Sequence, residues 1–264
     1  MASHPYLDWP HFHAFAHRGG TGTAAENTMA AFQDAVDLGY AYLETDVHLT
    51  ADGAVVAFHD EDLSRTCGVA ARIENLTWSE LKNIRVDGTH RIPLLEEILS
   101  TWPSVRINID CKSDSVVEPL IGLLRRTNVL DRVCVGSFSD KRLNQVRMSL
   151  GEDVCTSLGP RGVARLLAAT KSHDRLATGL SAHVAQVPVK QGPVPLVTKS
   201  FVETAHRIGL LVHVWTVDDP LEMARLIDLG VDGIMSDDIR ALRDVLMTRG
   251  MWPRSDFSQE SAPT

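Results

Sequence analysis

The sequence predicts a (β/α)8 barrel, the α/β fold in which helices surround a ring of eight parallel strands. Short apolar runs of strand length alternate with amphipathic segments of helix length, and the alternation repeats eight times within about 240 residues. A Rossmann-type open sheet is the weaker alternative, because no GxGxxG motif follows the first strand. The predicted strands are residues 13–17, 42–47, 106–111, 132–137, 153–158, 180–184, 210–216 and 233–237.

The segments between these strands carry signals for helix ends. Asn27 and Thr28 offer side-chain oxygens that can cap a first helix, and Gly39 stands where that helix would end. Gly209 and Gly230 end two later helices in the same way. The predicted helices are roughly residues 28–38, 94–100, 115–127, 139–149, 161–171, 199–208, 219–229 and 238–249.

One segment interrupts the alternation. Residues 48–93 contain an extra apolar run, AVVAFHD, and a short helical pattern near 77–83. We interpret this segment as an excursion from the end of the second strand. Residues 13–250 are therefore predicted to form a single domain, and residues 251–264, rich in Ser, Pro and acidic side chains, are expected to be a disordered tail.

Composition narrows the class of protein further. The chain has 264 residues, of which 44% are hydrophobic and 23% are charged, and its net charge of −8 argues against a basic nucleic-acid-binding surface. It contains no apolar run of membrane-spanning length and no secretory signal pattern. The four cysteines lack metal-binding spacing, and because three of them sit in apolar runs, buried and reduced thiols are expected. We therefore expect a cytoplasmic protein without a stable membrane anchor; its oligomeric state stays open.

Polar residues gather where the predicted strands end. In barrels of this kind the catalytic groups sit at the carboxyl ends of the strands, so groups far apart in sequence can meet at one pocket mouth. The candidates at these ends are His17, Arg18, Glu44, Asp46, Asp110, Lys112, Trp215, Thr216, Ser236 and Asp237, and His59 closes the excursion.

Glu44 and Asp46 are the most informative pair, because residues two apart share one face of a strand. Two carboxylates on a buried face repel each other and are costly unless a cation lies between them. Asp110 adds a third oxygen ligand, and an all-oxygen site suits Mg²⁺, Ca²⁺ or Mn²⁺ better than zinc. A single carboxylate of this kind is more often a helix cap or a surface ion pair, so the prediction depends on all three together.

The remaining candidates suit chemistry at a phosphate. His17 and His59 can act as a general acid and a general base. Arg18 and Lys112 supply fixed positive charge for a group that stays negative through the reaction. A cation, two histidines and two basic side chains together indicate cleavage of a phosphodiester. A barrel that only binds phosphate esters is the non-enzymatic alternative.

The motifs also follow one another in a known order. They are AHRGG, ENTMAAF, LETDVHLTADGAVVAFHDEDLSRT, IPLLEEIL, INIDCK, VGSF, HVWTVDD and GVDGIMSDD, and they span roughly residues 13–240. This series resembles the signature of the glycerophosphodiester phosphodiesterase family. The resemblance implies a (β/α)8 barrel with one divalent cation, Mg²⁺ or Ca²⁺ with Mn²⁺ as a further candidate. It also implies hydrolysis of a small-molecule glycerophosphodiester to glycerol 3-phosphate and an alcohol.

Carried over to this chain, the resemblance makes Glu44, Asp46 and Asp110 the metal ligands and His17 and His59 the acid–base pair. Arg18 and Lys112 would contact the phosphate, and Trp215 would line the pocket beside the glycerol moiety. Glu26 and Asn27 would support the site or cap a helix. The family often has Glu where this chain has the shorter Asp110, which would bring the metal closer to the third strand or add a bridging water.

The resemblance leaves several points open. The same site could belong to a lysophospholipase D or a sphingomyelinase D-like lipid phosphodiesterase, which would need an apolar access groove. The sequence shows no cluster of apolar loops that would form one. The preferred alcohol, the native metal and the assignment of acid and base between the histidines also stay open. So does the choice between direct attack by water and attack through a cyclic phosphate.

Overall fold

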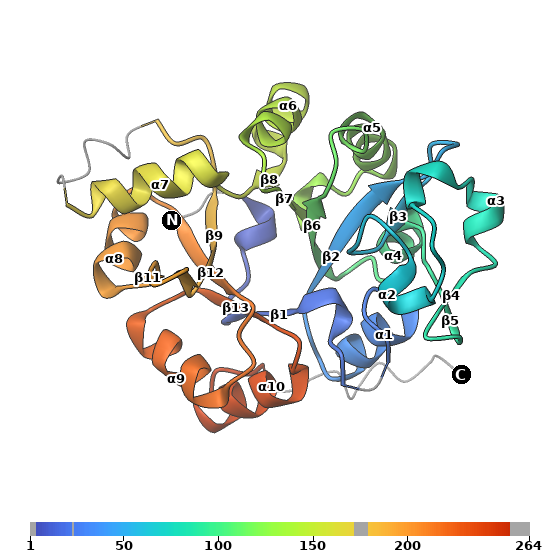
Figure 1. Ribbon diagram of the computed structural model, residues 1–264. Helices are drawn as coiled ribbons and strands as arrows, with labels where there is room; N and C mark the ends of the chain where they lie inside the picture. Colours follow the sequence, from blue (N-terminus) through green and yellow to red (C-terminus); the bar gives the residue numbers. More distant parts are fainter. Residues whose placement is uncertain (1–3, 23, 172–178, 254–264) are drawn as a thin grey trace, which may run out of the picture.

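The computed structural model describes residues 4–22, 24–171 and 179–253. Eight parallel strands form the predicted barrel, in the ring order β8, β7, β6, β2, β1, β13, β12 and β9. A parallel bridge between Ser157 and Val184 joins β8 to β9, so that the ring nearly closes. Figure 1 shows the helices arranged around these strands. The predicted fold class is confirmed.

The strands agree with the prediction at seven of the eight positions. The barrel strands are β1 (His13–Ala16), β2 (Tyr42–Leu49), β6 (Arg106–Cys111), β7 (Val133–Gly136), β8 (Cys155–Thr156), β9 (Val184–Pro188), β12 (Leu211–Trp215) and β13 (Gly233–Ser236). The sixth strand was predicted at 180–184 but lies at Val184–Pro188. That prediction was wrong because pairing with β12, from Leu211 with Val184 to Trp215 with Pro188, determines where β9 lies rather than the local apolar run at 180–184.

The outer helices have local signals for their ends. Thr28, rather than Asn27, caps α1, since its side chain accepts a hydrogen bond from the Ala31 amide. Gly230 ends α9 in the left-handed conformation. The helices are α1 (Met29–Asp37), α4 (Leu95–Thr101), α5 (Val117–Thr127), α6 (Asp140–Leu150), α7 (Pro160–Ala169), α8 (Lys199–Arg207), α9 (Pro220–Leu229) and α10 (Ile239–Thr248).

The excursion after β2 begins with an antiparallel strand, β3 (Val55–Ala57), which pairs with the end of β2. Its apolar side chains form a small cluster of their own beside the barrel, so it needs no second domain core. In Figure 1 it lies to the right of the strands. Its other elements are α2 (Ser64–Cys67), η3 (Ile73–Asn75), α3 (Trp78–Leu81), β4 (Arg85–Val86) and β5 (His90–Arg91).

Aromatic packing fills the barrel near the amino ends of its strands. The N-terminal turn η1 (Pro5–Leu7) places Tyr6 against Tyr42, whose hydroxyl donates a 2.8 Å hydrogen bond to the Tyr6 carbonyl. Phe15, Cys134 and Cys155 belong to the same buried cluster. The remaining short elements are η2 (His17–Gly19), η4 (Leu130–Arg132), η5 (Gly151–Asp153), β10 (Lys190–Gln191) and β11 (Val194–Pro195).

The end of the described chain stays on the core. Met251 and Trp252, which the sequence assigned to the tail, pack against the main core cluster, and the Trp252 ring lies edge-on to Tyr40. The rest of the predicted tail, from residue 254, is outside the described residues. All four cysteines are free thiols, and Cys111, Cys134 and Cys155 are buried. Across the described segments, no helix combines the length and hydrophobicity that a membrane span requires.

Candidate active site

One cavity at the carboxyl ends of the strands contains all eight side chains to which the sequence assigned a catalytic, metal-binding or substrate-binding function. Its volume is about 580 Å³, within the range of pockets that enclose small-molecule ligands. The eight are His17, Arg18, Glu44, Asp46, His59, Asp110, Lys112 and Trp215. Residues that lie up to 198 positions apart (17 to 215) are therefore brought together by the barrel.

The turn after β1 determines where His17 and Arg18 lie. Arg18 has a positive φ of 53°, and Gly19 and Gly20 follow with φ of 85° and 86°. A Cβ on Gly19 would lie 2.8 Å from the Cβ of Ala31, so a side chain at this position would collide with α1. The glycines of the HRGG motif are therefore required by the tight turn that carries His17 into the cavity.

His17 lies between two carboxylates. Its Nδ1 donates a 2.7 Å hydrogen bond to Asp237, and its Nε2 lies 3.7 Å from Glu44 Oε2. Burial lowers the pKa of His17, but the Glu44 and Asp237 carboxylates outweigh burial and hold this pKa above its ordinary value. Asp237 thus fixes the ring so that Nε2 is the nitrogen free to act on a substrate.

His59 has a similar partner. Its Nδ1 donates a 2.6 Å hydrogen bond to Asp60, and Arg65 Nε binds the other oxygen of Asp60 at 2.6 Å. Arg65 also binds Glu26, which in turn accepts a 3.1 Å hydrogen bond from Arg18. His59 is thus connected to Arg18 through Asp60, Arg65 and Glu26. The sequence singled out Glu26 as supporting, but no signal marked Arg65.

The pKa values of the two carboxylates of β2 are shifted in opposite directions. Glu44 accepts a 3.1 Å hydrogen bond from the Arg18 amide, but burial, Asp46 and Asp110 together raise the pKa of Glu44 to about 8. Burial would also raise the pKa of Asp46, but the Lys112 ammonium and the Arg18 guanidinium outweigh it and hold this pKa below its usual range. Lys112 Nζ lies 2.8 Å from Asp46, whereas Arg18 Nε forms a 3.2 Å ion pair with it outside hydrogen-bond geometry.

Asn27 is a hydrogen-bond partner of Asp46. Its Nδ2 donates a 3.1 Å hydrogen bond to Asp46 Oδ2, and its Oδ1 accepts a 2.7 Å hydrogen bond from the Thr45 hydroxyl. Asn27 is buried and has a φ of 54°, a conformation that Asn tolerates better than most residues. The supporting function predicted for Asn27 in the ENT motif is therefore to orient a carboxylate of β2.

The three carboxylates fit a hard cation by their chemistry. Lys112 Nζ lies between Asp46 and Asp110, 2.7 Å from the Asp110 carboxylate. In the part of the chain that the structure describes, no three acidic, histidine or cysteine side chains stand in a ready-made metal cage. Burial is the largest cause of the raised pKa of Glu44, and the neighbouring Asp46 and Asp110 carboxylates raise it further, so a cation among these oxygens would relieve their repulsion. A site whose protein ligands are all oxygen atoms is what Mg²⁺ or Ca²⁺ prefers.

Asn108 and Gln186 are among the cavity residues that the sequence analysis did not single out. Gln186 Nε2 donates a 2.7 Å hydrogen bond to Asn108 Oδ1, and both side chains line the cavity. Asn108 lies two residues before Asp110 on β6, so strand alternation could have found it. Gln186 lies on β9, the strand that the sequence misplaced, and so had no usable signal.

The far side of the cavity is apolar. Trp215, at the end of β12, stacks edge-on to Phe138, with ring centroids 5.4 Å apart. Beyond this pair, the connection from β8 to α7, α7 itself, the end of β9 and the chain before α8 supply mostly aliphatic side chains. These are Leu158, Pro160, Val163, Ala164, Leu167, Val187, Pro188 and Leu196.

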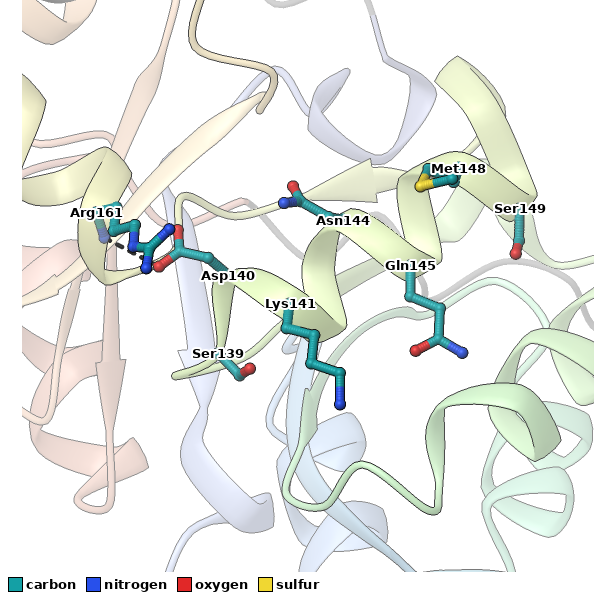
Figure 2. A pocket seen from close by; sticks show the side chains of 8 residues that line it. All are labelled: Ser139, Asp140, Lys141, Asn144, Gln145, Met148, Ser149 and Arg161. Atoms are coloured by element: carbon teal, nitrogen blue, oxygen red, sulfur yellow. Dashed lines mark hydrogen bonds between the residues drawn. The ribbon is translucent and has the colours of Figure 1, made fainter.

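Figure 2 shows a different pocket, which lies outside the barrel along α6. It is lined by Ser139, Asp140, Lys141, Asn144, Gln145, Met148, Ser149 and Arg161. The Arg161 amide donates a 3.2 Å hydrogen bond to Asp140, which occupies one carboxylate oxygen in joining α7 to α6. None of the predicted site residues lies here, so the chemistry is placed at the barrel mouth.

The fold and the cavity define a class of protein: a (β/α)8 barrel with the groups for acid–base and electrostatic catalysis on a phosphate ester. The glycerophosphoryl diester phosphodiesterase family model matches residues 17–241. The chain belongs to this family, and it is accordingly a phosphoric diester hydrolase that cleaves glycerophosphodiesters. Enzymes of the family generally depend on a divalent cation.

Individual relatives agree with this assignment. A glycerophosphodiester phosphodiesterase of Mycobacterium tuberculosis is 38% identical over 90% of this chain and 92% of its own length. A human lysophospholipase D is 29% identical over 88% of this chain and 85% of its own. The solved structure of an Oleispira antarctica phosphodiesterase, in complex with the product sn-glycerol-3-phosphate, covers 93% of this chain and 100% of its own, with 22% identity and a TM-score of 0.75.

Proposed function

We propose that His17 and His59 carry out the proton transfers of glycerophosphodiester hydrolysis in this cavity. The observation that supports this most directly is that each ring donates its Nδ1 proton to a carboxylate, Asp237 or Asp60, within one cavity. That arrangement fixes the tautomer in which Nε2 can accept a proton from the attacking oxygen, or, once protonated, give one to the leaving alkoxide.

Glu44, Asp46 and Asp110 are the residues that would hold the divalent cation, Mg²⁺ or Ca²⁺ with Mn²⁺ as a further candidate. When bound, the cation supplies positive charge that polarises a phosphate oxygen. The support is the oxygen-only donor set and the closeness of the Asp46 and Asp110 carboxylates to Glu44, which add to the effect of burial on the pKa of Glu44. Because Lys112 lies between Asp46 and Asp110, we propose that it contacts the substrate phosphate from this position.

Arg18 and Trp215 would complete recognition of the substrate. Arg18 reaches the cavity beside Asp46 and is held there by Glu26, so its charge can face a phosphate with little loss of side-chain freedom. Trp215 presents its ring at the end of β12 and would pack against the glycerol moiety. The product seen in the Oleispira relative, sn-glycerol-3-phosphate, is of the size and charge that this half of the cavity suits.

The first experiment measures release of glycerol 3-phosphate from glycerophosphocholine by the purified, metal-stripped protein, with Mg²⁺, Ca²⁺ or Mn²⁺ added back. Restoration by one of these ions would support the carboxylate site and identify the working metal. Unchanged activity after thorough stripping would contradict it. No release under any condition would mean that the preferred diester carries a different alcohol.

A second experiment separates acid from base. Replacing the alcohol by 4-nitrophenol makes protonation of the leaving group unnecessary. The alanine variant, of His17 or of His59, whose activity recovers on the nitrophenyl substrate would identify the general acid. Recovery of neither variant, or of both, would contradict a division of labour between the two rings.

We further propose that the chain functions in the cytoplasm on small molecules rather than nucleic acid. The support is the four free cysteines and the net charge of −8. Residues 13–250 would act as one catalytic domain. Thiol titration of protein prepared from its native compartment would check the reduced state, and disulfide-bonded protein would contradict a cytoplasmic location.

A further inference from the structure

Arg65, on the one-turn helix α2, binds two carboxylates that come from different segments of the chain. Its Nε donates a 2.6 Å hydrogen bond to Asp60 Oδ2. Its Nη1 and Nη2 donate hydrogen bonds of 3.1 and 2.6 Å to the two oxygens of Glu26. Glu26 is therefore bound in the bidentate geometry that a planar guanidinium provides, while a third N–H of the same group holds Asp60.

Each of these carboxylates also holds a side chain of the cavity. Asp60 Oδ1 accepts the 2.6 Å hydrogen bond from His59 Nδ1, and Glu26 Oε1 accepts a 3.1 Å hydrogen bond from Arg18 Nη1. His59 and Arg18 line the cavity, whereas Arg65 is not among the described residues that line it. Arg65 can therefore influence the reaction through the two carboxylates rather than by contact with the substrate.

The local structure of α2 fixes the backbone of Arg65. Leu63, directly before the helix, is fully buried in the apolar cluster of the excursion. The Ser64 amide donates a 2.8 Å hydrogen bond to Asp62, and Gly68 ends the helix in the left-handed conformation with a φ of 67°. Because the backbone is held at both ends of the helix, the guanidinium is directed toward the same two carboxylates.

Glu26 lies between two guanidinium groups. Burial would raise the pKa of Glu26, but the hydrogen bond from Arg65 and the charge of Arg18 outweigh burial and lower this pKa. Glu26 is therefore ionised at neutral pH and shares its charge between the two arginines. Without Arg65, Arg18 would be the single cationic partner of Glu26 among the described ion pairs, and it would be held toward Glu26 and away from a phosphate.

We propose that Arg65 is a positioning residue that couples phosphate binding by Arg18 to proton transfer by His59. The inference rests on the proposed function and adds to it a residue outside the described lining of the cavity. By binding a carboxylate from each, Arg65 joins the connection after β1 to the excursion after β2, the two segments that carry these functional side chains. The ring that transfers the proton thereby keeps its place relative to the phosphate.

The test replaces Arg65 by Gln and measures kcat for glycerophosphocholine together with the Kd of inorganic phosphate, by calorimetry on the metal-loaded enzyme. We expect Arg65→Gln to lower kcat by about 10- to 100-fold, as for groups that orient catalytic side chains. The Kd of phosphate should rise by at least about threefold, because Arg18 turns toward Glu26. A wild-type value of either quantity in Arg65→Gln would overturn the coupling.

Arg72→Gln is the matched control. Arg72 lies on the same excursion, its side chain is 48% exposed against 49% for Arg65, and it also binds two carboxylates, those of Glu61 and Glu74. Its removal should leave kcat and the Kd of phosphate near their wild-type values. Equal losses in Arg72→Gln and Arg65→Gln would assign the effect to general charge or to loosening of the excursion, and would overturn the positioning role.

Arg65→Lys separates geometry from charge. Lysine keeps the positive charge, but its single nitrogen cannot reproduce the fork that holds Glu26 and Asp60 together. We expect a kcat between those of the wild type and Arg65→Gln. Full recovery of kcat and of the Kd of phosphate in Arg65→Lys would show that charge alone is sufficient, which would overturn a role in positioning.

A double-mutant cycle with Asp60→Asn identifies the path of the effect. In that background Arg65→Gln should lower kcat by less than about threefold more, because its influence on His59 passes through Asp60. It should still raise the Kd of phosphate as it does in the wild type, because that influence passes through Glu26. Losses of kcat that multiply independently would overturn this path.

His59→Ala distinguishes failure of this inference from failure of the proposed function. A wild-type kcat in His59→Ala would overturn the proposed function, and the coupling with it, because Arg65 would have no catalytic ring to position. A large loss of kcat in His59→Ala, with wild-type kcat and phosphate Kd in Arg65→Gln, would overturn the inference alone. Losses in both variants, with Arg72→Gln unaffected, would support it.

Discussion

The two halves of the cavity differ in how their residues are held. In the charged half, each side chain has a specific polar partner: His17 has Asp237, His59 has Asp60, and Asp46 has Asn27. In the apolar half, α7 and β9 present aliphatic side chains that contact a ligand without directional bonds. The charged half therefore depends on individual atoms, whereas the apolar half depends on shape and area. Substitutions in the charged half should accordingly lower activity by large factors, whereas substitutions in the apolar half should change activity by small steps.

The largest effect is expected from the histidines. His17→Ala and His59→Ala should each lower kcat for glycerophosphocholine by on the order of 10²- to 10⁴-fold, the usual contribution of a general acid or base. Circular dichroism and the melting temperature should show that the fold is kept. Turnover like that of the wild type in either variant would remove that ring from the proposed mechanism.

The second largest effect is expected from the carboxylates that would bind the metal. Asp110→Asn should raise the concentration of Mg²⁺ or Ca²⁺ needed for half-maximal activity by at least about tenfold, because an amide oxygen is a weaker ligand than a carboxylate. Asp110→Glu should restore metal binding, which can be measured by calorimetry apart from activity. An unchanged metal requirement in Asp110→Asn would place the cation on other residues.

A smaller effect on activity is expected at Asp60, the hydrogen-bond partner of His59. Asp60→Asn should lower kcat by roughly 10- to 100-fold, as for partners that orient functional groups, with little change in KM. Glu61→Gln is the control, since Glu61 is exposed and pairs only with Arg72 among the described contacts. If Asp60→Asn and Glu61→Gln lose the same activity, the loss reflects general charge rather than the orientation of the ring.

Two buried histidines that do not line the cavity give a prediction for the free energy of unfolding. His13 Nδ1 and His213 Nε2 lie 3.0 Å apart, and burial with the nearby Arg106 lowers the pKa of His13 to about 4. Burial also lowers the pKa of His213. A histidine whose folded pKa is depressed supplies stability that is fully present above its unfolded pKa, near 6.5, and is lost as the pH falls toward 4.

The free energy of unfolding should therefore decrease by on the order of 1 to 3 kcal/mol between pH 6.5 and pH 4. Urea unfolding across this range measures it. The double variant His13→Leu with His213→Leu removes both titrating rings and should flatten the dependence. An equally steep dependence in that variant would assign the acid sensitivity to the carboxylates of the charged half instead.

The sequence by itself predicted the barrel and the catalytic, metal-binding and phosphate-binding candidates of the charged half. Strand periodicity placed Glu44 and Asp46 on one face, and the rule that barrel strands end at the active site brought His17, Asp110 and Lys112 to the same mouth. Charged groups are informative because burying them is costly, so their position in an apolar run already points to a partner. The partners themselves, such as Arg65 behind Asp60, required the fold.

Only the tertiary structure decided the apolar half. Val163 and Leu167 have the same chemistry as Leu166, and an aliphatic side chain gives no sign of whether it faces the core or a cavity. The placement of β9 four residues later than predicted, which brings Gln186 and Pro188 to the cavity, came from pairing with β12 rather than from local preference. A polar residue in an apolar run predicts a partner, because burying it without one is costly. Whether an apolar residue packs in the core or lines a cavity depends on the neighbouring elements, which only the tertiary structure places.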